Sequence, residues 1–256
     1  MTRTTELFST ADGVKISLDW YRHGGGEPAV IICPGFFQSK ETKTFQRMAQ
    51  ALATTRDVLA MDFRGHGRSS GLYTFSAREG ADLEAVLSWA AERYQQLGIV
   101  GFSMGGAIAI NTVSRHPERV RTLVAVSAPS SFEEVEFRWW TPEAMRTGIQ
   151  GMESGAGCRP GNLFLKKERA IDTVRNLSQV PLLFIHGTRD VIVDAQHSHR
   201  LYAAAPEPKR LHIIQGGSHA HALFRDAPDR FTRLVNSWLD ETLPTAEYVV
   251  RPLKVC

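Results

Sequence analysis

The sequence predicts an α/β fold with one mostly parallel, twisted sheet and helices on both of its faces. Two observations lead to this prediction. Short apolar runs, typical of strands buried on both sides, recur at residues 29–33, 58–61, 97–101, 123–126, 182–185 and 211–214. Consecutive runs are separated by segments long enough for a helix, and parallel strands need such crossovers.

An antiparallel hairpin is expected before the first of these runs. Between residues 6 and 22 apolar and polar residues alternate around Asp12 and Gly13, a pair that favours a turn. With the six apolar runs, the hairpin makes an eight-stranded sheet. The hairpin is expected at the edge of that sheet.

Helices are expected at residues 42–55, 79–96, 104–116, 195–205 and 222–243. In the last segment, apolar residues fall largely on one face, which is most simply explained by packing on the sheet. These residues are Phe224, Phe231, Leu234, Val235 and Trp238.

The 256 residues are expected to form a single domain, 1–256, because one sheet flanked by helices accommodates this length. The α/β rhythm is interrupted at about residues 129–175, which contain three prolines and five glycines, and we interpret this segment as a short cap insertion. Its large apolar residues either line a pocket under the cap or form the cap's own small core. They are Phe132, Phe137, Trp139, Trp140, Met145 and Met152. The tail, residues 245–256, either adds an extended piece or lies on the surface.

Composition and charge indicate a soluble protein with no nucleic-acid partner. The formal net charge of +3 comes from 30 basic and 27 acidic residues scattered along the chain, without a basic stripe. No stretch approaches the roughly 20 apolar residues of a membrane span, and the polar N-terminus lacks the apolar core of a secretory signal. Cys33, Cys158 and Cys256 are too few and too widely spaced for a disulfide framework or a zinc cluster. We therefore expect a cytoplasmic protein without stable membrane insertion.

Ser103 is a candidate nucleophile because of its place between a strand and a helix. It lies in the sequence Gly101-Phe102-Ser103-Met104-Gly105, which follows an apolar run and opens a helical segment. Glycines two residues away on either side allow a sharp turn, where larger side chains would clash with neighbouring backbone. Such a turn lifts the serine hydroxyl out of the sheet.

A serine hydroxyl needs a base, and the base needs a group that orients it. Asp190 follows the apolar run at 182–185, and His219 follows the run at 211–214. The carboxyl ends of parallel strands form the crevice where ligands bind in open α/β sheets. Ser103, Asp190 and His219 are therefore expected to converge there.

The order Ser, Asp, His, together with the glycine-flanked serine, resembles the α/β-hydrolase-fold serine hydrolases over nearly the whole chain. Two further segments match that family: Cys33-Pro34-Gly35-Phe36 after the third strand and the run from Asp62 to Gly71 after the fourth. The resemblance implies an oxyanion hole formed by the backbone N–H groups of Phe36 and Met104. The sequence departs from many relatives at Cys33-Pro34, where they carry a histidine before the glycine.

Several nearby residues are weaker candidates for the same roles. Asp194 is the alternative acid, although it is expected to cap a helix, and His221 is the alternative base, although only position 219 fits the family motif. Histidines at positions 66 and 186 are expected to be packed or hydrogen-bonded structural residues. Those at 197 and 199, two apart on a helix, are expected on the surface.

Together these features predict a cofactor-independent serine hydrolase with no metal. Its expected substrate is a small carboxylic ester with a partly apolar acyl group, cleaved through an acyl-enzyme as in carboxylesterases, monoacylglycerol-lipase-like enzymes and other small lipases. Three alternatives stay open: thioester or amide cleavage, acyl transfer or perhydrolysis through the same acyl-enzyme, and a non-catalytic protein that binds a small molecule. A serine at position 103 argues against dehalogenase and epoxide-hydrolase chemistry, which use an aspartate nucleophile.

Overall fold

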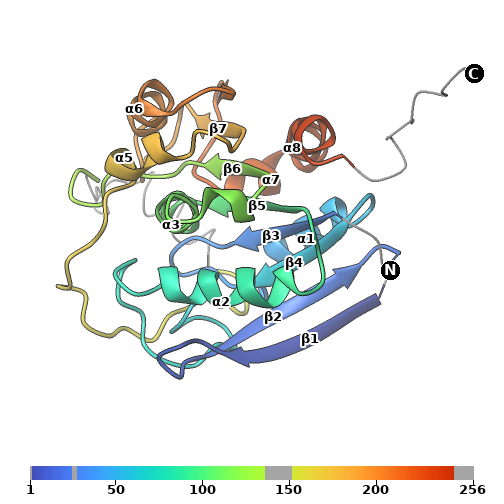
Figure 1. The fold of residues 1–256 in the computed structure, drawn as a ribbon. Helices are drawn as coiled ribbons and strands as arrows, with labels where there is room; N and C mark the ends of the chain where they lie inside the picture. The colour runs from blue at the N-terminus through green and yellow to red at the C-terminus, as the bar shows by residue number, and fades with distance from the viewer. Residues whose placement is uncertain (1, 25–27, 136–151, 245–256) are drawn as a thin grey trace, which may run out of the picture.

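A computed structural model describes residues 2–24, 28–135 and 152–244. As predicted, eight strands form one sheet; their order in it is β1-β2-β4-β3-β5-β6-β7-β8 (Figure 1). The strands are β1 (Thr2–Ser9), β2 (Lys15–Arg22), β3 (Ala29–Cys33), β4 (Asp57–Met61), β5 (Leu97–Phe102), β6 (Thr122–Val126), β7 (Leu182–Gly187) and β8 (Lys209–Ile214).

The sheet is parallel except at the edge where the chain begins. Strands β1 and β2 form the expected antiparallel hairpin, and β2 also pairs with β4 in the antiparallel sense. All pairs from β4 through β3 to β8 are parallel, with Ile31 beside both Leu59 and Ile99 in the centre. Strands β3 to β7 are buried along their whole length, which explains their continuous apolar sequence.

Helices cover both faces of the sheet (Figure 1). The main ones are α1 (Lys43–Leu52), α2 (Gly80–Ala91), α3 (Met104–Val113), α6 (Gln196–Ala204), α7 (Ala222–Asp226) and α8 (Pro228–Thr242). Two separate apolar clusters result. One joins one side of the sheet to α2, α3 and α6, and the other joins the opposite side to α1, α7 and α8.

The predicted helix at 222–243 is wrong in one respect, because it is two helices. Helix α7 ends at Asp226 and α8 begins at Pro228, with Ala227 in a non-helical conformation between them (φ −147°, ψ 68°). The proline ring disfavours the helical region for the residue before it, so Pro228 both ends the first helix and starts the second. Phe224 and Phe231 still pack together, with ring centroids 6.0 Å apart.

The segment predicted as a cap is described only at its two ends. Residues 136–151 lie outside the described residues, and with them Phe137, Trp139, Trp140 and Met145. The returning end forms bridges from Cys158 to His66 and from Pro160 to Tyr73, so it lies against the loop after β4. It also contains a short helix, α5 (Ala170–Thr173), that the sequence does not predict.

The tail, residues 245–256, also lies outside the described residues. Within the described ranges, no helix has the length and apolarity needed to cross a bilayer.

Candidate active site

Ser103 lies on a tight, strained turn between β5 and α3. Its backbone angles are φ 49° and ψ −117°, a conformation that costs a residue with a side chain of order 1–3 kcal/mol and is commonly found at functional sites. The Ser103 N–H donates to the carbonyl of Val126 at the end of β6, 2.8 Å away. The strand ladder thereby fixes the turn, and the side chain is left partly exposed at the carboxyl end of the sheet.

The glycines around Ser103 are required by close backbone contacts, as the sequence predicts. A Cβ atom on Gly101 would lie 2.7 Å from the Cα of Gly106. A Cβ atom on Gly105 would lie 2.3 Å from the carbonyl oxygen of Cys33 and 2.4 Å from that of Pro34. Glycine at these two positions therefore lets α3 begin directly against β5 and against the loop after β3.

Substituting Gly105 by alanine is expected to lower the free energy of unfolding by about 1–3 kcal/mol, because the added methyl group collides with backbone that cannot rotate away. Thermal and urea unfolding measure this change. Gly24→Ala is the matched control, since a Cβ atom there meets nothing within 4 Å. Equal stability of the two variants would contradict the packing described for the start of α3.

Asp190 and His219 are brought together by neighbouring strands. Asp190 follows β7, His219 follows β8, and the Nδ1 atom of His219 lies 2.7 Å from Oδ2 of Asp190. The other carboxylate oxygen accepts the backbone N–H groups of Ile192, at 3.0 Å, and Val193, at 2.9 Å. The Asp190 side chain is fully buried and that of His219 is 11% exposed. One oxygen thus fixes the loop, and the other orients the imidazole.

The surroundings of Asp190 favour its charged form. Burial by itself would raise the pKa of this carboxyl, but the electrostatic interaction with His219 and hydrogen bonds from His186 and His219 lower the pKa below its usual value. The Nε2 atom of His186 lies 3.2 Å from Oδ2 of Asp190 and 2.8 Å from the carbonyl oxygen of Val193. The carboxylate is therefore held ionised and in place from two sides.

Ser103 and His219 lie on adjoining parts of the same sheet edge. The Ala220 N–H donates to Oγ of Ser127, 3.1 Å away, and Ser127 directly follows Val126, the backbone partner of Ser103. Among the described residues no hydrogen bond joins the Ser103 hydroxyl to the His219 imidazole. In ligand-free enzymes such nucleophile–base contacts are often loose and tighten when substrate binds.

The two alternative residues have other environments. Asp194 is exposed and lies one residue before Ala195, the N-cap of α6, rather than at the cap itself as predicted; its side chain accepts the Gln196 N–H at 2.8 Å. His221 packs beside Phe45, with ring centroids 6.0 Å apart. Burial lowers the pKa of His221 to about 3, with a smaller contribution from His219. Neither residue makes the carboxylate–imidazole contact found between Asp190 and His219.

The loop after β3 approaches Ser103 closely. A Cβ atom on Gly35 would lie 3.3 Å from the Cβ of Ser103, so the backbone entering Phe36 runs beside the serine. Met104 is the first residue of α3, and its N–H is one of those that an α-helix leaves without an internal partner. The two backbone segments that the family resemblance assigns to the oxyanion hole therefore flank the Ser103 side chain.

Aromatic side chains surround this loop. Phe36 is 43% exposed and stacks on the buried ring of Tyr73, with centroids 5.1 Å apart. Phe75 packs edge-on against both rings and contacts Phe132 on its other side. Phe37 is also 37% exposed. The loop that runs beside Ser103 therefore carries an apolar surface that is partly open to solvent.

The remaining histidines are mostly as predicted. His66 and His186 are buried and hydrogen-bonded, as expected for structural residues. The surface position predicted for His197 is wrong, because this side chain is only 2% exposed and its Nδ1 lies 2.8 Å from Oγ of Ser130. A sequence signal existed, since His197 and Leu201 are four residues apart and thus share the buried face of α6. Within the described part of the chain, no group of three or more His, Cys, Asp or Glu side chains is arranged to hold a metal ion.

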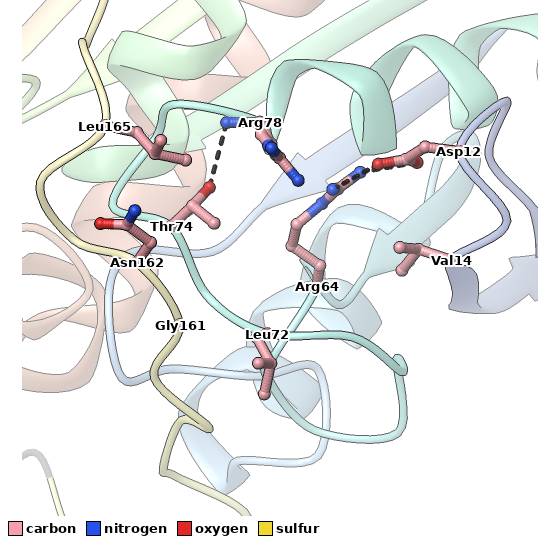
Figure 2. Close-up of a pocket in the computed structure, with 9 residues that line it drawn as sticks. All are labelled: Asp12, Val14, Arg64, Leu72, Thr74, Arg78, Gly161, Asn162 and Leu165. Atoms are coloured by element: carbon pink, nitrogen blue, oxygen red, sulfur yellow. Dashed lines mark hydrogen bonds and ion pairs between the residues drawn. The ribbon is translucent and has the colours of Figure 1, made fainter.

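A separate cavity of about 390 Å³ lies between the hairpin turn and the returning end of the segment at 152–169 (Figure 2). Arg64 lines it and forms an ion pair with Asp12, 2.8 Å away. On its other side Arg64 contacts the buried Asp82, at 2.7 Å. Arg64 therefore anchors the loop after β4.

Comparisons with known proteins agree with this architecture. Residues 28–152 match a family model described as alpha/beta hydrolase fold, and residues 161–226 match one described as serine aminopeptidase, S33. The uncharacterised protein YfhR of Escherichia coli K12 is 29% identical over 171 residues, which are 65% of this chain and 54% of that protein. The chain thus matches about half the length of this relative.

Two solved esterase structures have the same fold. The esterase Pf2001 of Pyrococcus furiosus superimposes with a TM-score of 0.75 at 24% identity, covering 94% of this chain and 93% of that one. The esterase RhEst1 of Rhodococcus sp. ECU1013 gives a TM-score of 0.78 at 23% identity, covering 93% of this chain and 99% of that one. At these identities the similarity establishes the fold.

Proposed function

Because this chain has the α/β-hydrolase fold, we propose that it is a serine hydrolase that cleaves a carboxylic ester through an acyl-enzyme. The single observation that carries this proposal is the 2.7 Å contact between buried Asp190 and His219, at the sheet edge where the strained Ser103 turn lies. A carboxylate–imidazole pair beside a serine forced out of its sheet is the arrangement that activates a hydroxyl.

In the proposed reaction Ser103 Oγ attacks the ester carbonyl carbon while His219 Nε2 takes the hydroxyl proton. The C–O bond to the leaving alcohol then breaks, and His219 returns the proton to the departing oxygen. Water attacks the acyl-enzyme in the second half, with His219 again as base, which releases the carboxylic acid and restores the serine. Asp190 holds the Nδ1–H of His219 and stabilises the imidazolium that forms in each half.

The oxyanion of each tetrahedral intermediate would be bound by the N–H groups of Phe36 and Met104. Losing one such donor typically costs about 2.7–4 kcal/mol of transition-state stabilisation. Support for the Phe36 role comes from Gly35, where an added Cβ atom would lie 3.3 Å from the Ser103 Cβ. No step in this scheme calls for a metal or an organic cofactor.

We propose a substrate that is a small ester with a partly apolar acyl group. The exposed rings of Phe36 and Phe37 beside the serine support this choice, since they would cover an alkyl or aryl chain. We further propose that residues 129–175 form a cap over the site of a single domain. The contacts of Cys158 and Pro160 with the loop after β4 support that arrangement.

Hydrolysis of a series of p-nitrophenyl esters, from acetate to laurate, tests the proposal. We expect saturable turnover with a maximum at intermediate chain length, because the apolar surface of the loop beside Ser103 favours a longer acyl group than acetate. Absence of turnover on every ester would contradict ester hydrolysis. Assays with thioesters of the same acyl groups would then test for a different acyl donor, and acyl-transfer assays would test for an acyl acceptor other than water.

Amide cleavage is the second candidate. It is supported by the match of residues 161–226 to the model described as serine aminopeptidase. Aminoacyl p-nitroanilides compared with p-nitrophenyl esters separate the two functions. Higher kcat/KM on the anilides would favour the aminopeptidase over the esterase.

On the acid side of the pH profile, we expect log(kcat/KM) to rise with a limiting slope of 1, as when a single group must lose its proton. His219 and His186 hold the pKa of Asp190 below its usual value despite its burial, so its carboxylate stays charged wherever the fold persists. A carboxyl of lowered pKa loses its stabilising contribution only as pH falls through that lowered value. Initial rates over a pH series measure the limiting slope. A slope of 2 on the logarithmic plot would show that a second group must also lose its proton.

A further inference from the structure

His66 is buried beside the proposed oxyanion loop but takes no part in the reaction scheme above. It lies in the sequence Arg64-Gly65-His66-Gly67 after β4, and its side chain is almost fully enclosed, with 1% of the residue exposed. A buried imidazole is costly unless its two nitrogens find partners. The hydrogen-bond partners of these two nitrogens therefore show which backbone segments the imidazole connects.

The two partners of the ring define a single tautomer. The Nδ1 atom lies 3.1 Å from the carbonyl oxygen of Arg64, which can only accept a hydrogen bond, so Nδ1 carries the proton. The Nε2 atom lies 3.3 Å from the backbone nitrogen of Phe37, which can only donate, so Nε2 is the acceptor. The imidazole thus connects the loop after β4 to the loop after β3.

The peptide that His66 holds needs support. Phe37 has φ 66°, in the left-handed region that residues with a side chain adopt at a cost. The hydrogen bond from its N–H to His66 favours this conformation. The same peptide follows Phe36, so its orientation also sets the direction of the preceding backbone beside Ser103.

Ring contacts hold the imidazole in one plane. His66 meets the ring of Tyr73 edge-on, with centroids 5.0 Å apart and an interplanar angle of 83°. It also meets the ring of Phe36 edge-on, at 6.3 Å and 87°. His66 thus contacts both the side chain of Phe36 and the peptide that follows it.

Ion pairs fix Arg64, the residue whose carbonyl oxygen accepts the Nδ1–H of His66. The Arg64 backbone N–H donates to Oδ2 of Asp82, 2.8 Å away, and the Arg64 guanidinium also binds Asp82. The guanidinium binds Asp12 as well (Figure 2). The carbonyl that accepts the Nδ1–H therefore belongs to a rigid stretch of backbone. A ring held on this side can fix the Phe37 peptide on its other side.

The surroundings of His66 favour the neutral ring, in which Nε2 can accept a hydrogen bond. Burial lowers the pKa of His66, and Arg159 lowers it further, while the Arg64 carbonyl and Glu79 oppose this change. Tyr73, in the loop after β4, packs edge-on against the ring, and Cys158, in the returning end of the segment at 152–169, pairs with His66 through a backbone bridge. Protonation would place an N–H on Nε2 facing the N–H of Phe37, so it would break the contact.

We propose that His66, in its Nδ1–H tautomer, is a positioning residue that holds the Phe36–Phe37 peptide so that the Phe36 N–H faces the oxyanion. This proposal rests on the proposed function, since the direction of that N–H matters to catalysis only if a tetrahedral intermediate forms on Ser103. His66 touches neither the substrate nor the reacting atoms in this scheme. Its effect is transmitted through one peptide bond.

Two amide variants, each of which replaces one nitrogen of the imidazole, separate the proposed role from simple packing. In His66→Asn the side-chain N–H₂ replaces Nδ1–H and keeps the bond to Arg64, but nothing accepts the Phe37 N–H. In His66→Gln the side-chain oxygen reaches the place of Nε2 and keeps that acceptor. We expect His66→Asn to lower kcat by about 10- to 100-fold with a small change in KM, because a misplaced oxyanion donor acts only on the transition state. The kcat of His66→Gln should be much closer to that of the wild type.

Inhibitor binding and stability complete this comparison. A boronic acid that forms a tetrahedral adduct should bind the Asn variant more weakly by the same factor as kcat/KM falls. Melting temperatures should be lowered similarly in both variants, since each loses the ring contacts with Tyr73 and Phe36 and one of the two hydrogen bonds of the imidazole. Wild-type kcat in the Asn variant would overturn the proposal. Equal losses in both variants that follow their melting temperatures would overturn it as well, in favour of a purely structural histidine.

A measurement that needs no activity distinguishes failure of this proposal from failure of the proposed function. ¹⁵N NMR of histidine-labelled protein at neutral pH should show His66 with a protonated Nδ1 and a bare Nε2. The opposite tautomer, or a ring protonated on both nitrogens at neutral pH, would overturn the role of His66. If the tautomer is as described but the wild type hydrolyses no ester and fluorophosphonate leaves Ser103 unlabelled, the proposed function fails while the contact with Phe37 stands.

Discussion

Replacing Ser103 by alanine is expected to lower kcat for ester hydrolysis by about 10⁴- to 10⁶-fold, because the acyl group then has no atom to which it can be transferred. The variant should remain folded, since the bond from the Ser103 N–H to Val126 involves only backbone. Alanine also has a smaller side chain to accommodate at φ 49°. Rates on a p-nitrophenyl ester and the melting temperature measure the two effects separately.

Ser114→Ala is a suitable control for this variant. Ser114 lies at the other end of α3, and its hydroxyl donates to the Asn111 carbonyl, 2.7 Å away. Its loss should leave kcat unchanged. If Ser103→Ala retained most of the wild-type rate, the hydrolysis would have to use another nucleophile.

Replacing Asp190 by asparagine should lower kcat by about 10³- to 10⁴-fold, mainly through the orientation of His219. Asparagine keeps a carbonyl oxygen for the N–H groups of Ile192 and Val193, so the loop after β7 is retained. It then presents its N–H₂ to Nδ1 of His219, where a carboxylate oxygen lies at 2.7 Å in the wild type. The imidazole is driven into the tautomer that has no free Nε2 to act as a base.

Asp194→Asn provides the matched control, because this aspartate is exposed and its contact with the Gln196 N–H can be kept by the amide oxygen. Its kcat should stay close to that of the wild type. Circular dichroism and thermal melting verify that both variants are folded. Equal losses in the two variants would remove the reason for choosing Asp190 as the acid of the site.

Sequence patterns were sufficient to predict the sheet and the positions of the candidate site residues. The apolar runs are buried strands, and their order in the chain brings Asp190 beside His219 through adjoining strands β7 and β8. The glycines around Ser103 lie where neighbouring backbone leaves no room for a Cβ atom. These features are local or follow from the way parallel strands must be connected.

Contacts between loops could not be predicted in the same way. Nothing in the sequence around His66 indicates that it accepts the N–H of Phe37, because that contact depends on how two loops from neighbouring strands fold over each other. The burial of His197 depends on Ser130 lying against α6. The apolar face that runs from Phe224 to Trp238 predicts one continuous helix, whereas Pro228 within it is the residue at which the structure divides that helix.

The central claim is that Ser103 becomes acylated with His219 as its base. The most direct test is to treat the native protein with a fluorophosphonate and to locate the adduct by mass spectrometry of its peptides. We predict one adduct per chain, on Ser103, formed far more slowly in His219→Ala and absent from Ser103→Ala. An adduct on another residue, or none while the protein still hydrolyses esters, would contradict the claim.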